Sequence, residues 1–487
     1  MRKNSWWIWL LPFLLLSFNF QQRETKNDRP NVILVFIDDE GYGDVGCYGA
    51  TGFETPNIDN LARQGMRFTN FYAAQPVCSA SRAGLMTGCY PNRIGIFKAL
   101  FPYHKIGLNP DEYTLGEMFQ DQGYITACVG KWHLGWQKKF LPLQNGFDEF
   151  FGLPYSNDMW PRSDVTGKKL PPKKNGKPSY PELPLIEGNE KIEEITSLKD
   201  QDMLTTRYTE KAVGFINRNA GKPFFLYMAH TMAHIPLGVS DKFRGKSEQG
   251  LYGDVMMEID WSVGQIVKAV EQNNLTDNTI IIFTTDNGPW LSFGNHAGSA
   301  GGLREGKTTS WDGGQKVPFI IKWPGVVPEG IICNKLACAV DILPTMASII
   351  GGKLSENKID GVDISSLFKG NFDANPRETI LFYYDKNNLN AVRKGNWKLV
   401  LPHTYRSYNA KPGKNGHSGK RIKMVVEKPE LYNLRRDPAE QFNVIDYYPE
   451  IVDDLMVVVE EARDELGDLN VGLEKGKGNR DVGRVDN

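Results

Sequence analysis

The chain has 487 residues, with 57 Lys or Arg against 58 Asp or Glu, so its formal net charge is −1 with neutral histidines. This balance excludes a protein built mainly to coat nucleic acid, because such binding needs an excess of cations. With 40% hydrophobic and 24% charged residues, the chain has the composition of a globular protein, and its length suffices for two or three structural units.

The N-terminus has the pattern of a secretory signal peptide. Arg2 and Lys3 precede an apolar run from Trp6 to Phe18, and polar residues follow from Gln21. At ~1.5 Å per residue this run is too short to cross a ~30 Å hydrocarbon core. We therefore predict a signal peptide over residues 1–25 and an exported protein, periplasmic or secreted, without stable membrane insertion. A short uncleaved anchor is the alternative.

Four short apolar runs end in polar residues. They are Asn31 to Ile37 before Asp38 and Asp39, Tyr124 to Gly130 before Lys131 and His133, Phe224 to Ala229 before His230, and Thr279 to Thr285 before Asp286 and Asn287. Segments of helical periodicity separate these runs, which predicts an α/β fold with a large, mainly parallel sheet sandwiched by helices. Ligands bind beyond the carboxyl ends of such strands, so the polar endings should converge on one site.

The pattern between the strands indicates helices and one long connection. Helices are expected over Asn57 to Gln64, Thr114 to Gln122, Met203 to Asn217 and Met256 to Gln272, and a fifth strand over Val317 to Lys322. The segment from Tyr155 to Lys199 is rich in Pro, Lys and Gly and poor in apolar periodicity, which predicts a long loop. Such a loop is either disordered or functional, as part of a substrate-binding rim.

After about Thr379 the sequence changes to alternating, aromatic-rich runs. These predict a smaller C-terminal antiparallel sheet, on which a helix from Pro449 to Leu466 would pack. The predicted organisation is an N-terminal domain over 29–378, a C-terminal α+β subdomain over 379–466 and a polar tail over 467–487.

Hard oxygen ligands cluster at two of the strand ends: Asp38, Asp39, Asp286 and Asn287. This donor set suits Ca²⁺ or Mg²⁺ better than a soft metal. A divalent cation also explains how three carboxylates would sit together without repelling one another or taking up protons. For either Asp position alone, capping of the following helix is the alternative.

The segment from Pro76 to Gly88 has the pattern of a loop that enters a helix. Free amides at a helix N-terminus favour an anion, and Arg82 one turn further on strengthens that preference. A thiolate at Cys78 would be a poor partner for a calcium-type site, so the pattern calls for an oxygen there. Six cysteines are too few for a disulfide scaffold. Cys333 and Cys338 either pair across a turn or remain buried thiols.

The run Cys78-Ser79-Ala80-Ser81-Arg82 resembles the modification motif Cys-x-Pro/Ala-x-Arg of the type I sulfatases, the arylsulfatase family of the alkaline-phosphatase-like superfamily. The resemblance extends over about residues 30–466 and includes Asp38-Asp39, Gly130 to Gly135, Ala233 to Pro236, Thr285 to Gly288, Gly306 to Thr309, Leu431 to Leu434 and Asp437-Pro438. Ala80 stands where the family prefers Pro, and Asp312 where Glu is usual. The resemblance implies an alkaline-phosphatase-like fold whose N-terminal domain is catalytic.

The resemblance also implies a reaction and its residues. It implies a sulfatase that hydrolyses sulfate monoesters through a Cα-formylglycine made from Cys78, so a formylglycine-generating or equivalent maturation enzyme is an implied partner. One Ca²⁺ per chain would be held by Asp38, Asp39, Asp286, Asn287 and the modified Cys78. The implied catalytic residues are Cys78, Arg82, Lys131, His133, His234 and Lys307. Among them the cations would bind sulfate, His234 with Lys307 would protonate the departing alcohol, and His133 would assist the release of sulfate.

Export and a polar pocket favour a sulfated carbohydrate as the substrate. Five residues in loops near the predicted site are candidates for binding it: His104, Trp160, Arg162, His296 and Arg304. His230 is expected to be structural. The alternatives are an arylsulfatase, a phosphoester hydrolase on the same fold, and a non-catalytic protein that binds sulfated glycans.

Overall fold

The computed structural model describes residues 29–171 and 179–485. The predicted signal peptide over residues 1–25 lies outside the described residues. Within them, no helix combines the length and the apolar character needed to cross a bilayer.

A ten-stranded sheet forms the centre of the molecule, in the order β12-β2-β11-β10-β1-β9-β5-β6-β7-β8. Its strands are β1 (Asn31–Ile37), β2 (Met66–Phe68), β5 (Ile125–Lys131), β6 (Glu149–Leu153), β7 (Leu183–Glu187), β8 (Glu190–Ile195), β9 (Phe224–Ala229), β10 (Thr279–Thr285), β11 (Phe319–Lys322) and β12 (Ile331–Cys333). The run from β10 through β1, β9 and β5 to β6 is parallel, which confirms the predicted sheet.

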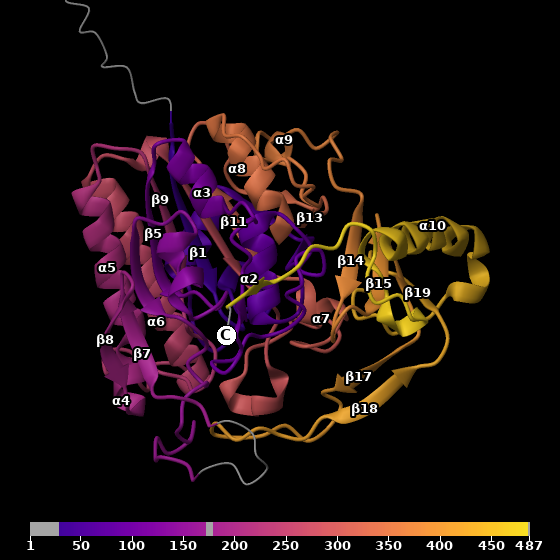
Figure 1. The fold of residues 1–487 in the computed structure, drawn as a ribbon, viewed down its shortest axis with the longest axis horizontal. Coiled ribbons are helices and arrows are strands. Elements are labelled where there is room, and N and C mark those ends of the chain that lie inside the picture. The colour runs from indigo at the N-terminus through magenta and orange to yellow at the C-terminus, as the bar shows by residue number, and fades with distance from the viewer. Residues whose placement is uncertain (1–28, 172–178, 486–487) are drawn as a thin grey trace, which may run out of the picture.

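Helices cover both faces of this sheet (Figure 1). One layer holds α1 (Pro56–Arg63), α5 (Leu204–Arg218) and α6 (Leu251–Gln272), and the other holds α2 (Cys78–Thr87), α3 (Leu115–Asp121) and α8 (Ile342–Ile350). Three short helices lie in the connections between these elements: α4 (Leu198–Asp202), α7 (Asp312–Gln315) and α9 (Ser365–Phe368).

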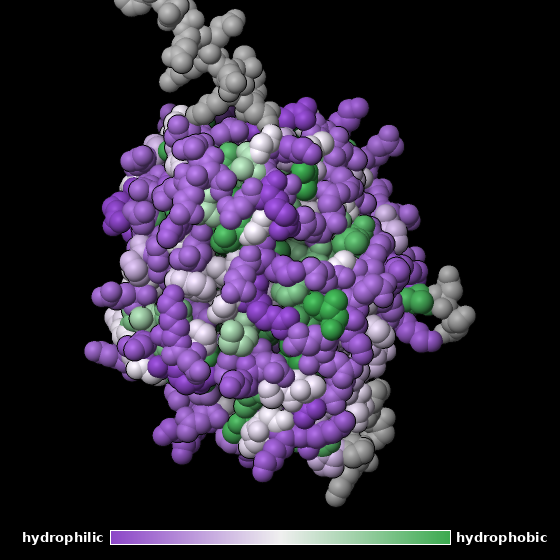
Figure 2. All heavy atoms as spheres, turned by 90° about the vertical axis from the view of Figure 1, so that its left-hand side faces the viewer, coloured by the Kyte–Doolittle hydropathy of each residue, from purple (hydrophilic) through white to green (hydrophobic). Residues whose placement is uncertain are grey.

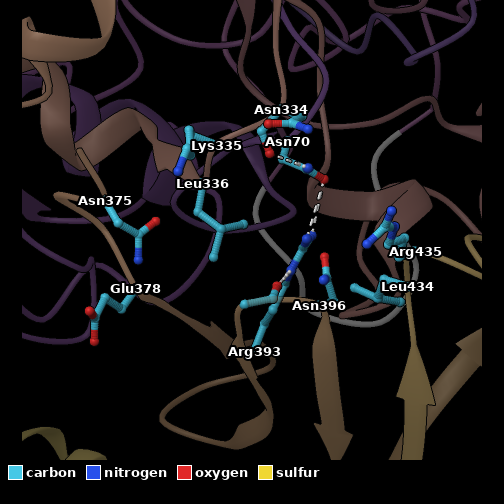
Figure 3. Close-up of a pocket in the computed structure, with 11 residues that line it drawn as sticks. Asn70, Asn334, Lys335, Leu336, Asn375, Glu378, Arg393, Asn396, Leu434 and Arg435 are labelled. Atoms are coloured by element: carbon cyan, nitrogen blue, oxygen red, sulfur yellow. Dashed lines mark hydrogen bonds between the residues drawn. The ribbon is translucent and has the colours of Figure 1, made fainter. Parts of the chain in front are cut away.

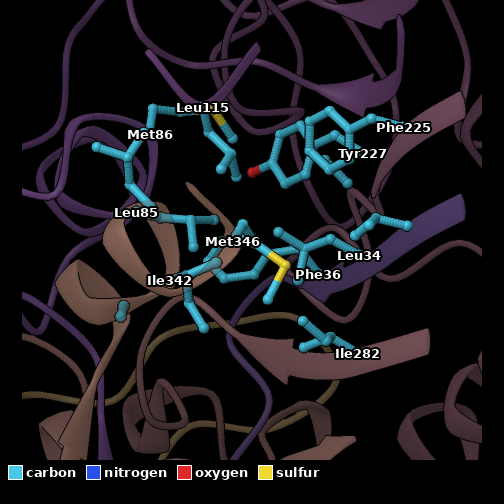
Figure 4. Packing of buried hydrophobic residues seen from close by; sticks show 14 of the residues in the cluster. Leu34, Phe36, Leu85, Met86, Leu115, Phe225, Tyr227, Ile282, Ile342 and Met346 are labelled. Atoms are coloured by element: carbon cyan, nitrogen blue, oxygen red, sulfur yellow. The ribbon is translucent and has the colours of Figure 1, made fainter. Parts of the chain in front are cut away.

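The alternation of side chains along β1 explains why every residue from Val32 to Ile37 is apolar. Leu34 and Phe36 pack toward α2 and α8, where Figure 4 shows them close to Leu85 and Met346. Ile33, Val35 and Ile37 point to the other face and pack in the core cluster beneath the opposite helical layer. Since both faces are covered, a continuous hydrophobic run is required rather than an alternating one.

The segment from Tyr155 to Lys199 differs from its prediction as a long loop. Its described part contains β7 and β8, which pair as a hairpin and extend the large sheet at one edge. Exposed charged residues on β8 obscured its strand pattern in the sequence. Figure 2 shows that the face carrying α5 and this hairpin is mostly hydrophilic, with small scattered apolar patches.

The C-terminal part forms a smaller antiparallel sheet, as predicted. Its strands are β14 (Thr379–Tyr383), β15 (Leu389–Lys394), β16 (Trp397–Val400) and β19 (Glu430–Asn433). The helix α10 (Pro449–Leu466) packs on this sheet through Leu455 and Val459. Three further pairs are β17 (His403–Ser407) with β18 (Ile422–Val426), β3 (Phe71–Tyr72) with β13 (Ala337–Cys338), and β4 (Ile106–Gly107) with β20 (Gly483–Arg484). All six cysteines, including Cys333 and Cys338, are free thiols.

Candidate active site

Cys78 is the first residue of α2 and lines a pocket of about 270 Å³. Val77, the residue before the helix, supplies no side-chain cap. The first amides of a helix have no intrahelical acceptor, and at α2 no side-chain cap replaces one. The positive end of the helix dipole also lies beside the thiol. This end of α2 favours a bound anion next to Cys78.

Arg82, one turn into α2, connects three strand ends. Its Nε and Nη2 donate to Asp286 Oδ2 at 3.1 and 2.9 Å, and its Nη1 donates to the Lys131 carbonyl at 2.9 Å. Lys131 Nζ in turn donates to Asp38 and, at 3.2 Å, to Ser156 Oγ. These fully buried groups fix the ends of β1, β5 and β10 relative to α2.

Two buried oxygens in this cluster lack hydrogen-bond partners. Asn287 Nδ2 donates to Asp39 Oδ1 at 2.8 Å, but within the described part of the chain Asp39 Oδ2 and Asn287 Oδ1 have no partner. The ligand atoms of Asp38, Asp39, Cys78 and His234 lie within 4.8 Å of one another. Because buried oxygens need partners, this cluster fits a metal site.

The protonation of the cluster follows from burial and charge. Burial alone would raise the pKa of Asp38, but Lys131 and His234 hold that pKa well below its ordinary value. Burial and the neighbouring Asp38 raise the pKa of Asp286 to about 7. Burial and Asp38 also raise the pKa of the Cys78 thiol. Without a bound metal ion the unmodified thiol is therefore neutral, and its sulfur is a poor partner for a hard cation.

In His133 and His234, one ring nitrogen contacts a backbone carbonyl and the other is available for proton transfer. His133 Nε2 lies 2.9 Å from the Leu100 carbonyl, and its buried Nδ1 has no partner among the described residues. His234 Nδ1 lies 2.6 Å from the Ile235 carbonyl, and its Nε2 lies 3.6 Å from Asp39 Oδ2. A carbonyl only accepts hydrogen bonds, so each contacting nitrogen carries a proton. His133 Nδ1 and His234 Nε2 are the free positions.

Lys307 completes the set of residues expected from the sequence. Its Nζ lies 2.6 Å from Asp39 Oδ1, 3.2 Å from Cys78 Sγ and 4.6 Å from the centre of the Trp290 ring. The structure thus brings together every predicted catalytic and metal-binding residue. His230 is buried apart from them, with its Nε2 3.3 Å from Ser262 Oγ.

None of the five substrate-binding candidates lines this pocket. They have other neighbours: His104 packs on Phe101, Trp160 donates to Asp164, Arg162 pairs with Glu182, His296 lies near Gly416, and Arg304 lies over the Trp311 ring.

Beside Cys78, His133, His234 and Lys307, the pocket is lined by residues that were not predicted as site residues. They include Lys98, Phe101, Met159, Trp290, Thr308 and Tyr384. Trp290 and Thr308 lie within three residues of predicted site residues, and this proximity along the chain could have indicated that they line the pocket. Tyr384 directly follows β14 of the C-terminal sheet, and no local pattern indicated that it reaches the site.

Comparisons with known proteins agree with this arrangement. A model of the sulfatase family matches residues 30–352, and a model of the C-terminal region of aryl-sulfatase matches residues 375–481. Arylsulfatase A of Bos taurus is 36% identical over 455 residues, which cover 89% of this chain and 86% of that protein. N-acetylgalactosamine-6-sulfatase of Canis lupus familiaris is 36% identical over 438 residues, covering 85% and 81%.

A solved structure shares the architecture as well. Ps i-CgsB, in complex with k-i-k-neocarrahexaose, has a TM-score of 0.73 and 29% identity, over 89% of this chain and 92% of that chain. The fold and the buried cluster at its strand ends define a hydrolase of the alkaline-phosphatase-like type. The chain belongs to the sulfatase family, whose members hydrolyse sulfuric esters and generally use a formylglycine and a metal ion.

Proposed function

We propose that this protein is an exported, calcium-dependent sulfatase that removes sulfate monoesters from a carbohydrate through a formylglycine made from Cys78. One observation carries the proposal: Cys78 Sγ lies 3.5 Å from Asp38 Oδ1 and 3.2 Å from Lys307 Nζ. The reactive position thus lies between a metal-ligand carboxylate and a cation. Export rests on the apolar run from Trp6 to Phe18.

The donor set supports a hard cation such as Ca²⁺. All candidate ligands except residue 78 and His234 are oxygen donors, and the unpartnered Asp39 Oδ2 and Asn287 Oδ1 supply two of them. We assign the ion to Asp38, Asp39, Asp286, Asn287 and the modified residue 78. An oxygen in place of the Cys78 sulfur would match this set, whereas the neutral thiol does not.

Charge balance explains how such a site would accept a sulfate ester. Three carboxylates face three cations: Asp38, Asp39 and Asp286 against Arg82, Lys131 and Lys307. These charges nearly cancel, so a divalent cation makes the site net positive. A sulfate ester carries one negative charge, and the pocket is therefore suited to it once the ion is bound.

Different side chains of the protein bind the sulfate, donate a proton and accept a proton during sulfate-ester cleavage. When present, the metal ion and the formylglycine supply a Lewis acid and an oxygen nucleophile. Arg82 and Lys131 orient the sulfate and offset its charge, and Lys307 Nζ does so from beside position 78. His234, protonated on both ring nitrogens, gives its Nε2 proton to the departing alcohol oxygen and keeps the Nδ1 proton that it donates to the Ile235 carbonyl. His133 Nδ1 accepts a proton when sulfate is released.

The lowered pKa of His133 supports its role as the base. Burial, together with Lys131 and Arg82, holds this pKa well below the ordinary value of 6.5. His133 is therefore neutral near pH 7, and its free Nδ1 keeps a lone pair to accept the proton.

A carbohydrate substrate is supported by the relatives. One of them is named for N-acetylgalactosamine 6-sulfate, and one structural neighbour was solved with a bound neocarrahexaose. The mouth of the pocket combines Lys98 and Asp158 with the rings of Phe101 and Trp290. Such a mixture of aromatic and polar groups suits a sugar ring.

Mass spectrometry of the peptide that contains Cys78 tests the proposal directly. Conversion of the thiol to the aldehyde lowers the peptide mass by about 18 Da. Active protein that retains its thiol would refute the mechanism. The Cys78→Ala variant should fold and release no sulfate from a panel of defined sulfated oligosaccharides. Faster turnover of matched phosphate esters would instead indicate a phosphoester hydrolase, and binding of the glycans without turnover would indicate a non-catalytic protein.

A further inference from the structure

One segment of the chain has a charge pattern that this reaction does not use. Residues 403–426 contain six Lys or Arg and no Asp or Glu, whereas the whole chain has a net charge of −1. The segment forms β17, β18 and the loop that joins them, and we call it the cationic arm. In Figure 1 the arm runs along the lower edge of the molecule, below the large sheet.

The tip of the cationic arm is held against the catalytic domain. The amides of Gly413 and Gly419 donate to the Ser292 carbonyl at 2.8 and 2.7 Å. Asn415 and Asn295 exchange two further hydrogen bonds, at 2.8 and 2.9 Å. Ser292 and Asn295 belong to the connection between Asn287 and Lys307, so the arm is fixed beside the active site.

Two cations of the arm face each other, and neither forms an ion pair within the described residues. Arg406 on β17 lies directly opposite Lys423 on β18, and both side chains are exposed. Like charges opposite each other destabilise a pair of strands. Within the described residues neither cation forms a salt bridge, and the same is true of Arg421. A bound anion would remove this repulsion.

These cations line a groove that continues the active-site pocket. The groove has a volume of about 680 Å³ and is lined by Arg406, Arg421 and Lys423. It shares three lining residues with the pocket of Cys78, namely Thr308, Tyr384 and Asp385. A ligand larger than one sugar unit can therefore extend from the pocket into the groove.

Arg421 is tied to the catalytic machinery by short contacts. Its Nη1 donates to the hydroxyl of Thr308, the residue after Lys307. Its guanidinium lies 5.5 Å from the centre of the Tyr408 ring, and the Tyr408 hydroxyl donates to the Lys307 carbonyl at 2.6 Å. The groove is thus held at a fixed position relative to Lys307.

We propose that the groove binds a second anionic group, a sulfate or a carboxylate, on a sugar next to the one that loses its sulfate. This inference rests on the proposed function and adds a substrate class to it: polyanionic oligosaccharides rather than small monosulfated compounds. Arg406 and Lys423 bind the second anion between the two strands. They are positioning residues, since the ester being cleaved lies in the pocket of Cys78.

The test compares two substrates in a double variant, Arg406→Ala with Lys423→Ala. One substrate is 4-methylumbelliferyl sulfate, and the other is the polysulfated tetrasaccharide that the unaltered enzyme desulfates fastest. The ratio of kcat/KM for the tetrasaccharide to that for the small ester should fall by about tenfold, mostly through KM. The matched control is Lys335→Ala with Arg435→Ala, in a separate polar pocket beside the C-terminal sheet (Figure 3), where the ratio should not change.

A second measurement keeps this inference separable from the proposed function. Binding of a heparin-derived hexasaccharide to Cys78→Ala protein should weaken by about tenfold with the Arg406 and Lys423 changes, and not with the control changes. If the unaltered enzyme releases no sulfate from either substrate, the proposed function fails and this binding result alone decides the role of the groove. An unchanged substrate ratio in active enzyme, or unchanged binding, overturns the inference. Equal weakening for single-stranded DNA of the same charge would also overturn it, since the groove would then not be selective for a glycan.

Discussion

Lys307 Nζ lies between Asp39 Oδ1, at 2.6 Å, and Cys78 Sγ, at 3.2 Å. One buried ammonium therefore contacts both a carboxylate that we assign to the metal site and the residue expected to carry the nucleophile. Burial opposes the charge on this lysine, yet Asp39 and the other acidic neighbours raise the pKa of Lys307 well above its ordinary value. Lys307 is a fixed positive charge at the reacting position.

Replacing Lys307 by Met should leave the protein folded and lower kcat/KM for sulfate esters by about 10²–10³-fold, the usual effect of removing one group that stabilises developing charge. Initial rates and thermal unfolding measured on the same samples check this. Lys322→Met, at the end of β11 where its ammonium contacts Gln64 at 2.6 Å, is the matched control and should keep normal rates. Similar losses in both variants would contradict the role assigned to Lys307.

Removal of metal should abolish activity reversibly. The unpartnered oxygens of Asp39 and Asn287 would be left buried without a cation, so the metal-free protein should also unfold at a lower temperature. Dialysis against a chelator, elemental analysis and readdition of Ca²⁺ test this. Asn287→Leu should raise the Ca²⁺ concentration that restores half of the activity. Full activity in protein shown to be free of metal would exclude the assigned site.

The sequence predicted those parts of the fold in which local pattern and burial agree. The runs that became β1, β9 and β10 are buried throughout and mainly apolar because both faces of each strand are covered, and their bounds match the prediction. The β7–β8 hairpin was missed because it lies at the sheet edge, where exposed charges interrupt the alternation.

Local sequence pattern also decided which residues of the candidate site could be predicted. Residues that follow buried strands, such as Asp38 and Asp286, were identifiable because parallel strands end at one edge of the sheet. Tyr384 follows β14 of the C-terminal sheet and reaches the pocket only through packing between the two parts of the chain. His104 and Arg304 have suitable chemistry, but their side chains are taken up by other contacts. These contacts depend on tertiary structure, so the local sequence around each residue does not predict them.

A buried ion cluster joins the C-terminal sheet to the catalytic domain. Lys398 on β16 lies 3.0 Å from Asp312 and 2.7 Å from Glu440, and all three side chains are fully buried. Lys398→Met would leave two carboxylates without their cation and should lower the free energy of unfolding by about 3–5 kcal/mol. Adding Glu440→Gln should restore part of that loss.

Lys394→Met is the control for that experiment. Lys394 forms an exposed pair with Asp454, and its removal should change the free energy of unfolding far less than the removal of Lys398, because solvent screens the pair. Urea unfolding followed by intrinsic fluorescence measures all four proteins. If Lys398→Met proved as stable as Lys394→Met, the cluster would not hold the two parts together.

His230 should make the protein less stable in acid. Burial lowers the pKa of His230 from 6.5 to about 3, so the folded protein keeps this ring neutral while the unfolded chain takes up a proton below about pH 6.5. The unfolded state then binds more protons, and the free energy of unfolding falls as the pH drops from about 6.5 toward 3. Above about pH 6.5 this contribution is constant. At about 1.4 kcal/mol per pH unit, His230 alone would cost about 2 kcal/mol at pH 5.

The His230→Gln variant isolates this effect, because glutamine can still contact Ser262 but does not titrate in this range. Urea unfolding at pH 7.5 and at pH 5 should show a stability loss about 2 kcal/mol smaller in the variant than in the unaltered protein. Sulfatase activity at pH 7.5 should be similar in both, since His230 lies apart from Cys78 and its neighbours. An equal loss in the two proteins would mean that His230 is protonated in the folded state, and that water or a neighbouring group reaches its buried Nδ1.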